Sequence, residues 1–353
     1  MTRGRSDGPA RRASGGTPAA RGTSVAIVGA GPCGLAAAIA LQQAGLRTIV
    51  YDRSCVVSSI ASYPTYMTFF STAEKISIGG LPFVTAGEKP TRREALAYYR
   101  MVVQYFGVRL RLYEHVIDIA RAGEHYIVRS ETARGSAEAA YDAIVIATGY
   151  FGTPNMLDVP GETLPHVTHV YREGHESFRR EVIVVGGGNS AVDAALDLYR
   201  CGAKVTIVHF AEGLDPNVKP WVLPDIRNRL ADGSIGARWQ SRVTRIDIDS
   251  VAIDGPAGPE QLRADRVYLM TGFTPNSTLL RELGVSIDAA TGVPWHDRAT
   301  METNVERVFI AGVLASGYDA NKVFIENGRG HGTLIAQRLL AVRPAAAGSQ
   351  VAQ

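Results

Sequence analysis

Two glycine turns carry the residues best suited to chemistry in this chain. The first covers residues 29–34 (GAGPCG) and the second covers residues 186–191 (GGGNSA). Glycines at this spacing let a strand turn sharply into a helix, so that a pyrophosphate can rest on the N–H groups at the start of that helix. We expect nucleotide contacts from Gly29, Gly31, Pro32, Cys33 and Gly34 in the first turn and from Gly186, Gly188, Asn189 and Ser190 in the second.

The residue that closes each unit indicates which nucleotide the unit holds. Asp52 ends the first unit, where a carboxylate can accept hydrogen bonds from a ribose diol. His209 stands at the matching place in the second unit and carries no negative charge to repel a 2′-phosphate. The basic residues His209, Lys219 and Arg227 favour NADPH over NADH there, unless the last two are only solvated loop residues. We expect FAD in the first site because the second motif follows it in an inserted domain.

Cys33 adds a candidate redox group to the first turn. A thiol at a helix N-terminus has a lowered pKa and more reactive thiolate, whereas a neighbouring pyrophosphate opposes this effect. The alternative is that this position only needs a small residue, because Ser190 matches it in the second turn. His331 is a candidate general acid for a leaving thiolate, or else a helix residue bonded to the backbone.

Each turn needs a strand before it and a helix and a strand after it. The apolar segments VAIV (25–28) and VIVV (182–185) supply the first strands. Thr148-Gly149 and Thr271-Gly272 end further buried strands, and each pair is followed by a proline-bearing segment. These paired segments indicate two crossovers between domains. Thr148 and Gly149 join the expected cofactor contacts because ligands bind at the carboxyl ends of parallel strands.

We therefore predict an α/β fold with two Rossmann-like dinucleotide-binding domains, the NADPH domain inserted into the FAD domain. The FAD-binding domain would be discontinuous, over 23–153 and 275–342, and the NADPH-binding domain would cover 154–274. We expect a disordered tail over 1–22 and a frayed C-terminus over 343–353. Periodicity predicts an amphipathic helix over 92–106 and a final helix from about Asn321 to Leu340.

The composition excludes several classes of protein. With 353 residues and 46% hydrophobic side chains the chain can bury sizeable cores, and no apolar run reaches the ~20 residues of a membrane span. The net charge of +3 comes from the arginine-rich segment 1–22, so the remainder offers no basic surface for nucleic acid. Three cysteines without a CxxC pair indicate a reducing cytoplasm, without structural disulfides or a metal site.

Four segments carry a resemblance to a known family. They are Gly31–Leu35 (GPCGL), Phe69–Glu74 (FFSTAE), Lys219–Pro224 (KPWVLP) and Phe324–Gly332 (FIENGRGHG). The chain resembles the two-domain thioredoxin-reductase-like flavoproteins, and more closely the bacillithiol disulfide reductase family. The redox CxxC of thioredoxin reductases is absent. Gly312-Val313 replaces the Gly-Asp pair of many relatives, so Val313 offers the flavin site a backbone N–H without a carboxylate.

The resemblance implies a function. It implies FAD, NADPH, a cytoplasmic homo-oligomer and reduction of a small-molecule disulfide with Cys33 as the reacting thiol. Arg329, Lys75 and Arg92 are candidate partners for substrate carboxylates, or else solvated side chains. One alternative is an NADPH-dependent flavoprotein that reduces a ferredoxin-like protein or oxygen without a redox cysteine. A non-enzymatic alternative is an FAD-binding redox sensor.

Overall fold

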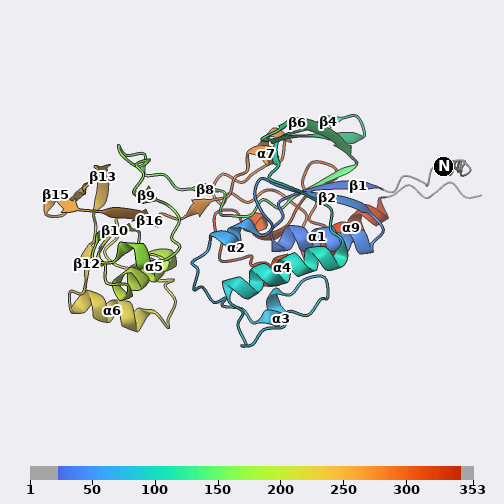
Figure 1. Ribbon diagram of the computed structural model, residues 1–353. Helices are drawn as coiled ribbons and strands as arrows, with labels where there is room; N and C mark the ends of the chain where they lie inside the picture. The colour runs from blue at the N-terminus through green and yellow to red at the C-terminus, as the bar shows by residue number, and fades with distance from the viewer. Residues whose placement is uncertain (1–22, 343–353) are drawn as a thin grey trace, which may run out of the picture.

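The computed structural model describes residues 23–342, so the expected tail (1–22) and frayed end (343–353) lie outside the described residues. Figure 1 shows two lobes, with β1, β2, α1, α4 and α9 in one and β10, β16, α5 and α6 in the other. Each lobe contains a five-stranded sheet in which every pairing is parallel. The fold class predicted from the sequence is confirmed.

The first sheet has the strand order β18-β7-β1-β2-β3. Its strands are β1 (Ser24–Val28), β2 (Arg47–Asp52), β3 (Leu110–Leu112), β7 (Ala143–Ile146) and β18 (Val308–Ile310). β7 and β18 are buried throughout, as expected for strands of a parallel sheet with both faces covered. An antiparallel sheet formed by β4 (His115–Ala122), β5 (His125–Thr132) and β6 (Gly135–Tyr141) lies between β3 and β7 in the chain.

The second sheet has the order β12-β11-β10-β16-β9. Its strands are β9 (Val167–Thr168), β10 (Glu181–Val185), β11 (Lys204–Val208), β12 (Ile235–Arg238) and β16 (Arg266–Leu269). A second antiparallel sheet, formed by β13 (Arg242–Ile246), β14 (Ser250–Gly255) and β15 (Gly258–Arg263), lies between β12 and β16 in the chain. The duplication therefore extends beyond the glycine turns. The two sheets differ in where one outer strand comes from in the chain. In the first sheet this strand, β18, follows the second domain, whereas in the second sheet it is β9, which precedes β10.

Helices cover both sheets. In the first domain they are α1 (Pro32–Gln43), α2 (Ser58–Ser62), α3 (Ala73–Ile76), α4 (Arg92–Phe106), α7 (Thr278–Glu282), α8 (Ile325–Gly328), α9 (His331–Ala341) and the 3₁₀ turn η2 (Gly312–Ser316). In the second they are α5 (Asn189–Arg200), α6 (Leu223–Ala231) and η1 (His175–Ser177). The predicted helix over 92–106 is confirmed as α4, which Thr91 and Glu94 cap reciprocally.

The single C-terminal helix predicted from Asn321 to Leu340 is wrong in its extent. The structure has two helices there, α8 and α9, separated at Arg329 and Gly330. Three glycines within five residues weaken the helix at this point. One of them, Gly332, lets α9 cross α1 so closely that a Cβ on Gly332 would overlap the backbone of Ala37.

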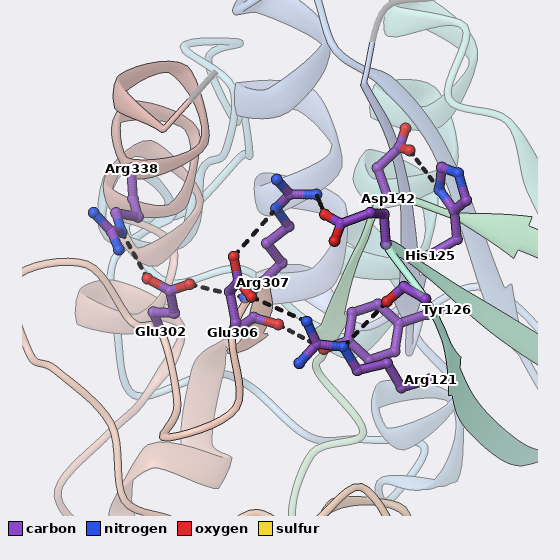
Figure 2. A network of polar contacts seen from close by, with 10 residues as sticks. Arg121, His125, Tyr126, Asp142, Glu302, Glu306, Arg307 and Arg338 are labelled. Carbon is purple, nitrogen blue, oxygen red and sulfur yellow. Dashed lines mark hydrogen bonds and ion pairs between the residues drawn. The ribbon is translucent and has the colours of Figure 1, made fainter. Parts of the chain in front are cut away.

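A polar network joins the two separate parts of the first domain (Figure 2). On the β4–β5 hairpin, Arg121 Nη2 lies 3.1 Å from the Glu306 carboxylate, and the Tyr126 hydroxyl donates to the Glu306 carbonyl at 2.6 Å. The nearly buried Glu302 accepts a hydrogen bond from Arg338 Nε of α9 at 2.6 Å. The contacts of Glu306 hold the chain that follows the inserted domain against the β4–β5 hairpin, and the contact of Glu302 holds the same chain to α9.

A short antiparallel ribbon carries the chain between the domains. It pairs β8 (Thr153–Pro154) with β17 (Phe273–Thr274), and Figure 1 shows β8 between the two lobes. Asn155 strengthens the ribbon, since its Oδ1 accepts from the Thr274 hydroxyl at 2.6 Å. The boundaries 153/154 and 274/275 fall at this ribbon, and we propose them as the limits of the inserted domain.

Candidate functional site

The first glycine turn joins β1 to α1. Gly29 has a φ of +116° and lies against the carbonyl of Ala147, so a side chain there would overlap the backbone. Gly34 lies equally close to the carbonyl of Gly29. In contrast, a Cβ on Gly31 would meet no atom within 4 Å. Two glycines therefore shape the turn, and the third leaves open space beside the N-terminus of α1, as a pyrophosphate requires.

Polar groups from the neighbouring strand ends surround this turn. The Asp52 carboxylate accepts hydrogen bonds from Ala30 N and from Ser54 N, both at 2.8 Å, which fix it beside the turn. Thr148 and Gly149 follow β7, and the Thr148 hydroxyl oxygen is buried without a hydrogen-bond partner among the described residues. A buried hydroxyl without a partner is costly unless a ligand completes it. The arrangement fits FAD.

Cys33 lies at the start of α1, directly after Pro32. Its sulfur contacts two glycines from the C-terminal part of the chain. A Cβ on Gly328 would come within 2.9 Å of Cys33 Sγ, and a Cβ on Gly312 within 3.2 Å. Val313 follows in η2, beside this contact. Burial raises the pKa of the Cys33 thiol to about 12.

His331 begins α9 on the other side of Gly312. The N–H of Gly312 donates to His331 Nδ1 at 3.1 Å, so the neutral imidazole carries its proton on Nε2. Burial, and then the neighbouring His296, lower the pKa of His331, which keeps the ring neutral at pH 7. The structure thus brings Cys33, Gly312 and His331 together. Nδ1 is used by the backbone, and Nε2 is the nitrogen with a proton to donate.

The second glycine turn has the same geometry as the first. Gly186 has a φ of +133° and lies against the carbonyl of Met270, while a Cβ on Gly188 would meet no atom within 4 Å. Ser190, the counterpart of Cys33, is exposed on the first turn of α5. The open space beside Gly188 fits the pyrophosphate of a second dinucleotide.

Asn189 has a role that the sequence did not reveal. Its Nδ2 donates to the carbonyl of Asn217 at 3.1 Å, and its Oδ1 accepts from the backbone N of Lys219 at 2.9 Å. Asp215 N also donates to the carbonyl of Gly187 at 2.9 Å. These bonds hold the loop over 213–222 beside the glycine turn, so both ends of the Asn189 amide are already engaged.

His209 is buried and faces the second glycine turn. A Cβ on Gly187 would lie 2.5 Å from His209 Cδ2, so the imidazole fills the space that a side chain would need. Trp239 packs edge-on against the ring, with centroids 6.4 Å apart. Burial lowers the pKa of His209, so the ring is neutral at pH 7. Its Nδ1 is buried without a partner among the described residues.

Lys219 makes contacts that do not involve His209. The Lys219 ammonium lies 2.5 Å from the Asp193 carboxylate and 4.3 Å from the centre of the Phe70 ring. It therefore lies where the second domain meets the first, with its charge already paired. This geometry does not favour the 2′-phosphate contact expected for Lys219 from the sequence.

Two of the cations considered for a substrate carboxylate instead hold backbone carbonyls. Arg329 Nη1 donates to the carbonyls of Glu74 at 2.8 Å and Ser77 at 2.5 Å. Arg92 donates to the carbonyl of Ala61 at 2.6 Å, at the end of α2. Lys75 is exposed on α3. The close contacts of Gly187 and Gly328 are with residues remote in the chain, so the sequence gives no signal for them.

Over residues 23–342 no helix is long and apolar enough to cross a bilayer. Within the same range, no group of three or more histidine, cysteine, aspartate or glutamate residues is arranged to hold a metal ion.

Comparison with known proteins agrees with this geometry. A family model described as pyridine nucleotide-disulphide oxidoreductase matches residues 26–312. The chain is 43% identical over 314 residues to bacilliredoxin reductase Bdr of Bacillus subtilis, covering 89% of this chain and 96% of that protein. The resemblance inferred from the four sequence segments is confirmed.

Solved structures give the same result. Bacillithiol disulfide reductase Bdr (YpdA) from Bacillus cereus superposes with a TM-score of 0.88 at 42% identity, covering 90% of this chain and 99% of that chain. The corresponding structure from Staphylococcus aureus gives a TM-score of 0.84 at 37% identity, covering 91% and 99%.

Proposed function

Since this chain belongs to the pyridine nucleotide-disulphide oxidoreductase family, we propose that it reduces the disulfide of a low-molecular-weight thiol such as bacillithiol disulfide. The chain is an FAD-dependent oxidoreductase that uses NADPH. The observation that carries the proposal is the position of Cys33, the one cysteine in the first glycine turn, in contact with Gly312 and Gly328. The similar proteins named above are themselves described as bacilliredoxin or bacillithiol disulfide reductases.

The part of this chain in the reaction is thiol–disulfide exchange. Cys33 Sγ bonds to one sulfur of the substrate, the substrate S–S bond breaks, and the other half leaves. The proton that Cys33 loses is balanced by the proton that the leaving half gains as it departs as a thiol. Two electrons and two protons then release the second half and restore the Cys33 thiol. When bound, FAD supplies these two electrons after accepting a hydride from NADPH.

His331 offers a hydrogen-bond donor to the sulfur that leaves in this exchange. Because Nδ1 accepts from Gly312 N, the proton of the neutral ring is on Nε2. We propose that Nε2–H donates a hydrogen bond to the leaving thiolate and so stabilises its developing charge. Gly312 therefore contacts both proposed groups. Its backbone N–H donates a hydrogen bond to His331, and its Cα packs against Cys33.

Anaerobic stopped-flow spectroscopy tests the proposal. NADPH should bleach the flavin absorbance of the purified holoenzyme, and bacillithiol disulfide should restore it, whereas an iron–sulfur protein should not. Reoxidation by the iron–sulfur protein alone would favour the alternative electron-transfer function. A preparation that binds no flavin would refute both.

Replacing the proposed nucleophile separates its role from cofactor binding. Cys33→Ser should keep its flavin, because Ser190 fills the same place in the second turn, but should lose at least about a hundredfold in disulfide turnover. Cys55→Ser is the matched control and should remain fully active. Undiminished turnover in Cys33→Ser would remove this residue from the mechanism.

We also propose that the enzyme works in the cytoplasm as a homo-oligomer. Its three cysteines are free thiols, which suits a reducing compartment. Light scattering coupled to size exclusion would report the mass of the holoenzyme, and a monomer at micromolar concentration would contradict the oligomer.

A further inference from the structure

Two of the residues expected to bind a 2′-phosphate beyond β11, His209 and Lys219, offer no free positive charge. His209 is neutral and turned toward Gly187 and Trp239. Lys219 is paired with Asp193. Selection of NADPH over NADH requires a cation close to the ribose, so another residue must provide it.

Arg242 is brought to this place by backbone pairing rather than by sequence proximity. His209 N donates to the carbonyl of Arg238 at 2.9 Å, and Ser241 N donates back to the carbonyl of His209 at 3.0 Å. Between them, Gln240 has a φ of +50°, a left-handed conformation that turns the chain from β12 into β13. Arg242 follows directly, at the first position of β13.

The guanidinium of Arg242 lies over an aromatic ring next to His209. Its Cζ is 5.0 Å from the centre of the Phe210 ring, and both side chains are exposed. Stacking on a ring fixes the plane of a guanidinium and leaves its N–H groups available at the edge. A phosphate is the anion that accepts two such parallel N–H groups.

The charge of Arg242 is also available. Asp254 faces it across the β13–β14 register, yet among the described residues Arg242 forms no ion pair. The other arginines of this region are paired, Arg238 with Glu260 at 2.7 Å and Arg245 with Asp247 at 2.9 Å. Glu212, which follows β11, accepts a hydrogen bond from Gln240 Nε2 at 3.5 Å.

Arg227 is the remaining candidate from the sequence. It is exposed on α6 and lines a cavity of about 250 Å³ with Leu214, Asp215 and Trp239. Neither His209 nor Phe210 lines that cavity, and Asp215 places a carboxylate in it. The cavity therefore suits a phosphate less well than the surface beside Phe210.

We propose that Arg242, stacked on Phe210, binds the 2′-phosphate of NADPH and thereby determines the choice of NADPH over NADH. This inference rests on the NADPH part of the proposed function and names the residue that discriminates. Phe210 acts as a positioning residue through Arg242.

Nucleotide binding to the full-length holoenzyme tests the proposal without turnover. Isothermal titration would use adenosine 2′,5′-bisphosphate and 5′-AMP, which differ by the 2′-phosphate alone. Arg242→Ala should weaken the bisphosphate about ten- to hundredfold, the range of one lost charge-assisted contact, and should leave 5′-AMP within about twofold. Phe210→Leu should give a smaller loss of the same selectivity. Arg245→Ala, on the same strand, is the control and should match wild type.

The outcomes separate this inference from the proposed function. Unchanged bisphosphate affinity in Arg242→Ala, or an equal loss for both nucleotides, overturns the assignment. A loss in Arg227→Ala with none in Arg242→Ala also overturns it. If wild type binds the bisphosphate more tightly than 5′-AMP and Arg242→Ala abolishes that preference, the assignment stands even when no disulfide is reduced. The proposed substrate would fail in that case, and the nucleotide site would not.

Discussion

At the scale of single residues, the two nucleotide turns differ in the second residue of the turn and in the closing residue that contacts it. In the first turn Asp52 accepts a hydrogen bond from Ala30 N, so the second residue of the turn can carry a side chain. In the second turn the larger ring of His209 occupies that space, and the matching residue is Gly187. The glycine at this position is therefore required by the histidine ring.

Gly187→Ala should weaken binding of NADPH roughly five- to hundredfold. Its Cβ would lie 2.5 Å from His209 Cδ2, and overpacking of this kind costs about 1–3 kcal/mol. Fluorescence quenching titrations would measure the dissociation constant. The double variant Gly187→Ala/His209→Ala should recover much of the loss, because the clash is gone. A double variant as weak as the sum of the single changes would show that the imidazole is not the cause.

Cys33 should react slowly with alkylating agents despite its place on a helix N-terminus. Burial raises its pKa from 9.0 to about 12, so the thiolate fraction at pH 8 falls by roughly a thousandfold relative to an unperturbed thiol. The rate with iodoacetamide, followed by mass spectrometry of the holoenzyme, should still be rising at pH 10. Cys55 gives an internal reference. A rate for Cys33 that levels off by pH 8 would contradict the raised pKa.

At the scale of elements, the crossing of α1 and α9 assembles the proposed disulfide site. Gly332 contacts the backbone of Ala37 in the middle of α1. This close approach places the first residue of α9, His331, on the N–H of Gly312 and next to the start of α1. The reactive residues lie far apart in the chain, and the packing of two helices brings them together.

Gly332→Ala should lower the free energy of unfolding by about 1–3 kcal/mol, because the added Cβ forces α9 away from α1. Urea unfolding of the holoenzyme, followed by circular dichroism and by flavin release, would measure it. Gly330→Ala is a matched control, since its Cβ would come no closer than 3.6 Å to the carbonyl of Asn327. Equal midpoints for the two variants would argue against the tight crossing.

At the scale of the whole molecule, an aromatic contact joins the domains. Phe70 of the first domain and Trp221 of the second have ring centroids 5.4 Å apart, and Lys219 lies over Phe70. Thr65 adds two bonds, from its N to the Arg172 carbonyl and from its hydroxyl to the Glu173 carboxylate, both at 3.0 Å. Because Asn189 holds the loop that carries Lys219, the contact connects the second glycine turn to the first domain.

Trp221→Ala should loosen the arrangement of the two domains. An aromatic pair contributes about 1 kcal/mol beyond its buried area. Its loss changes the equilibrium constant between two domain arrangements roughly fivefold. Small-angle X-ray scattering of the holoenzyme should give a larger radius of gyration than wild type. Trp295→Ala, an exposed tryptophan of the first domain, is the control. Scattering identical to that of wild type would mean that this contact does not set the arrangement.

The sequence by itself determined the parts of this protein that are local in the chain. Strand, glycine turn, helix and closing residue are contiguous, so both nucleotide units and the inserted-domain fold could be predicted from their order. The helix over 92–106 was equally predictable, because Thr91 and Glu94 form its cap within one turn. The hairpin of β14 and β15 was missed, since proline and glycine interrupt its apolar alternation.

Only the tertiary structure decided what depends on contacts between distant residues. Burial raises the pKa of the Cys33 thiol to about 12, an effect that no local pattern contains. Packing against Gly187 turned His209 inward and left it neutral. Lys219 forms an ion pair with Asp193, and the turn between β12 and β13 brings Arg242 over the ring of Phe210. Desolvation and pairing depend on neighbours in space, and spacing along the chain does not specify those neighbours.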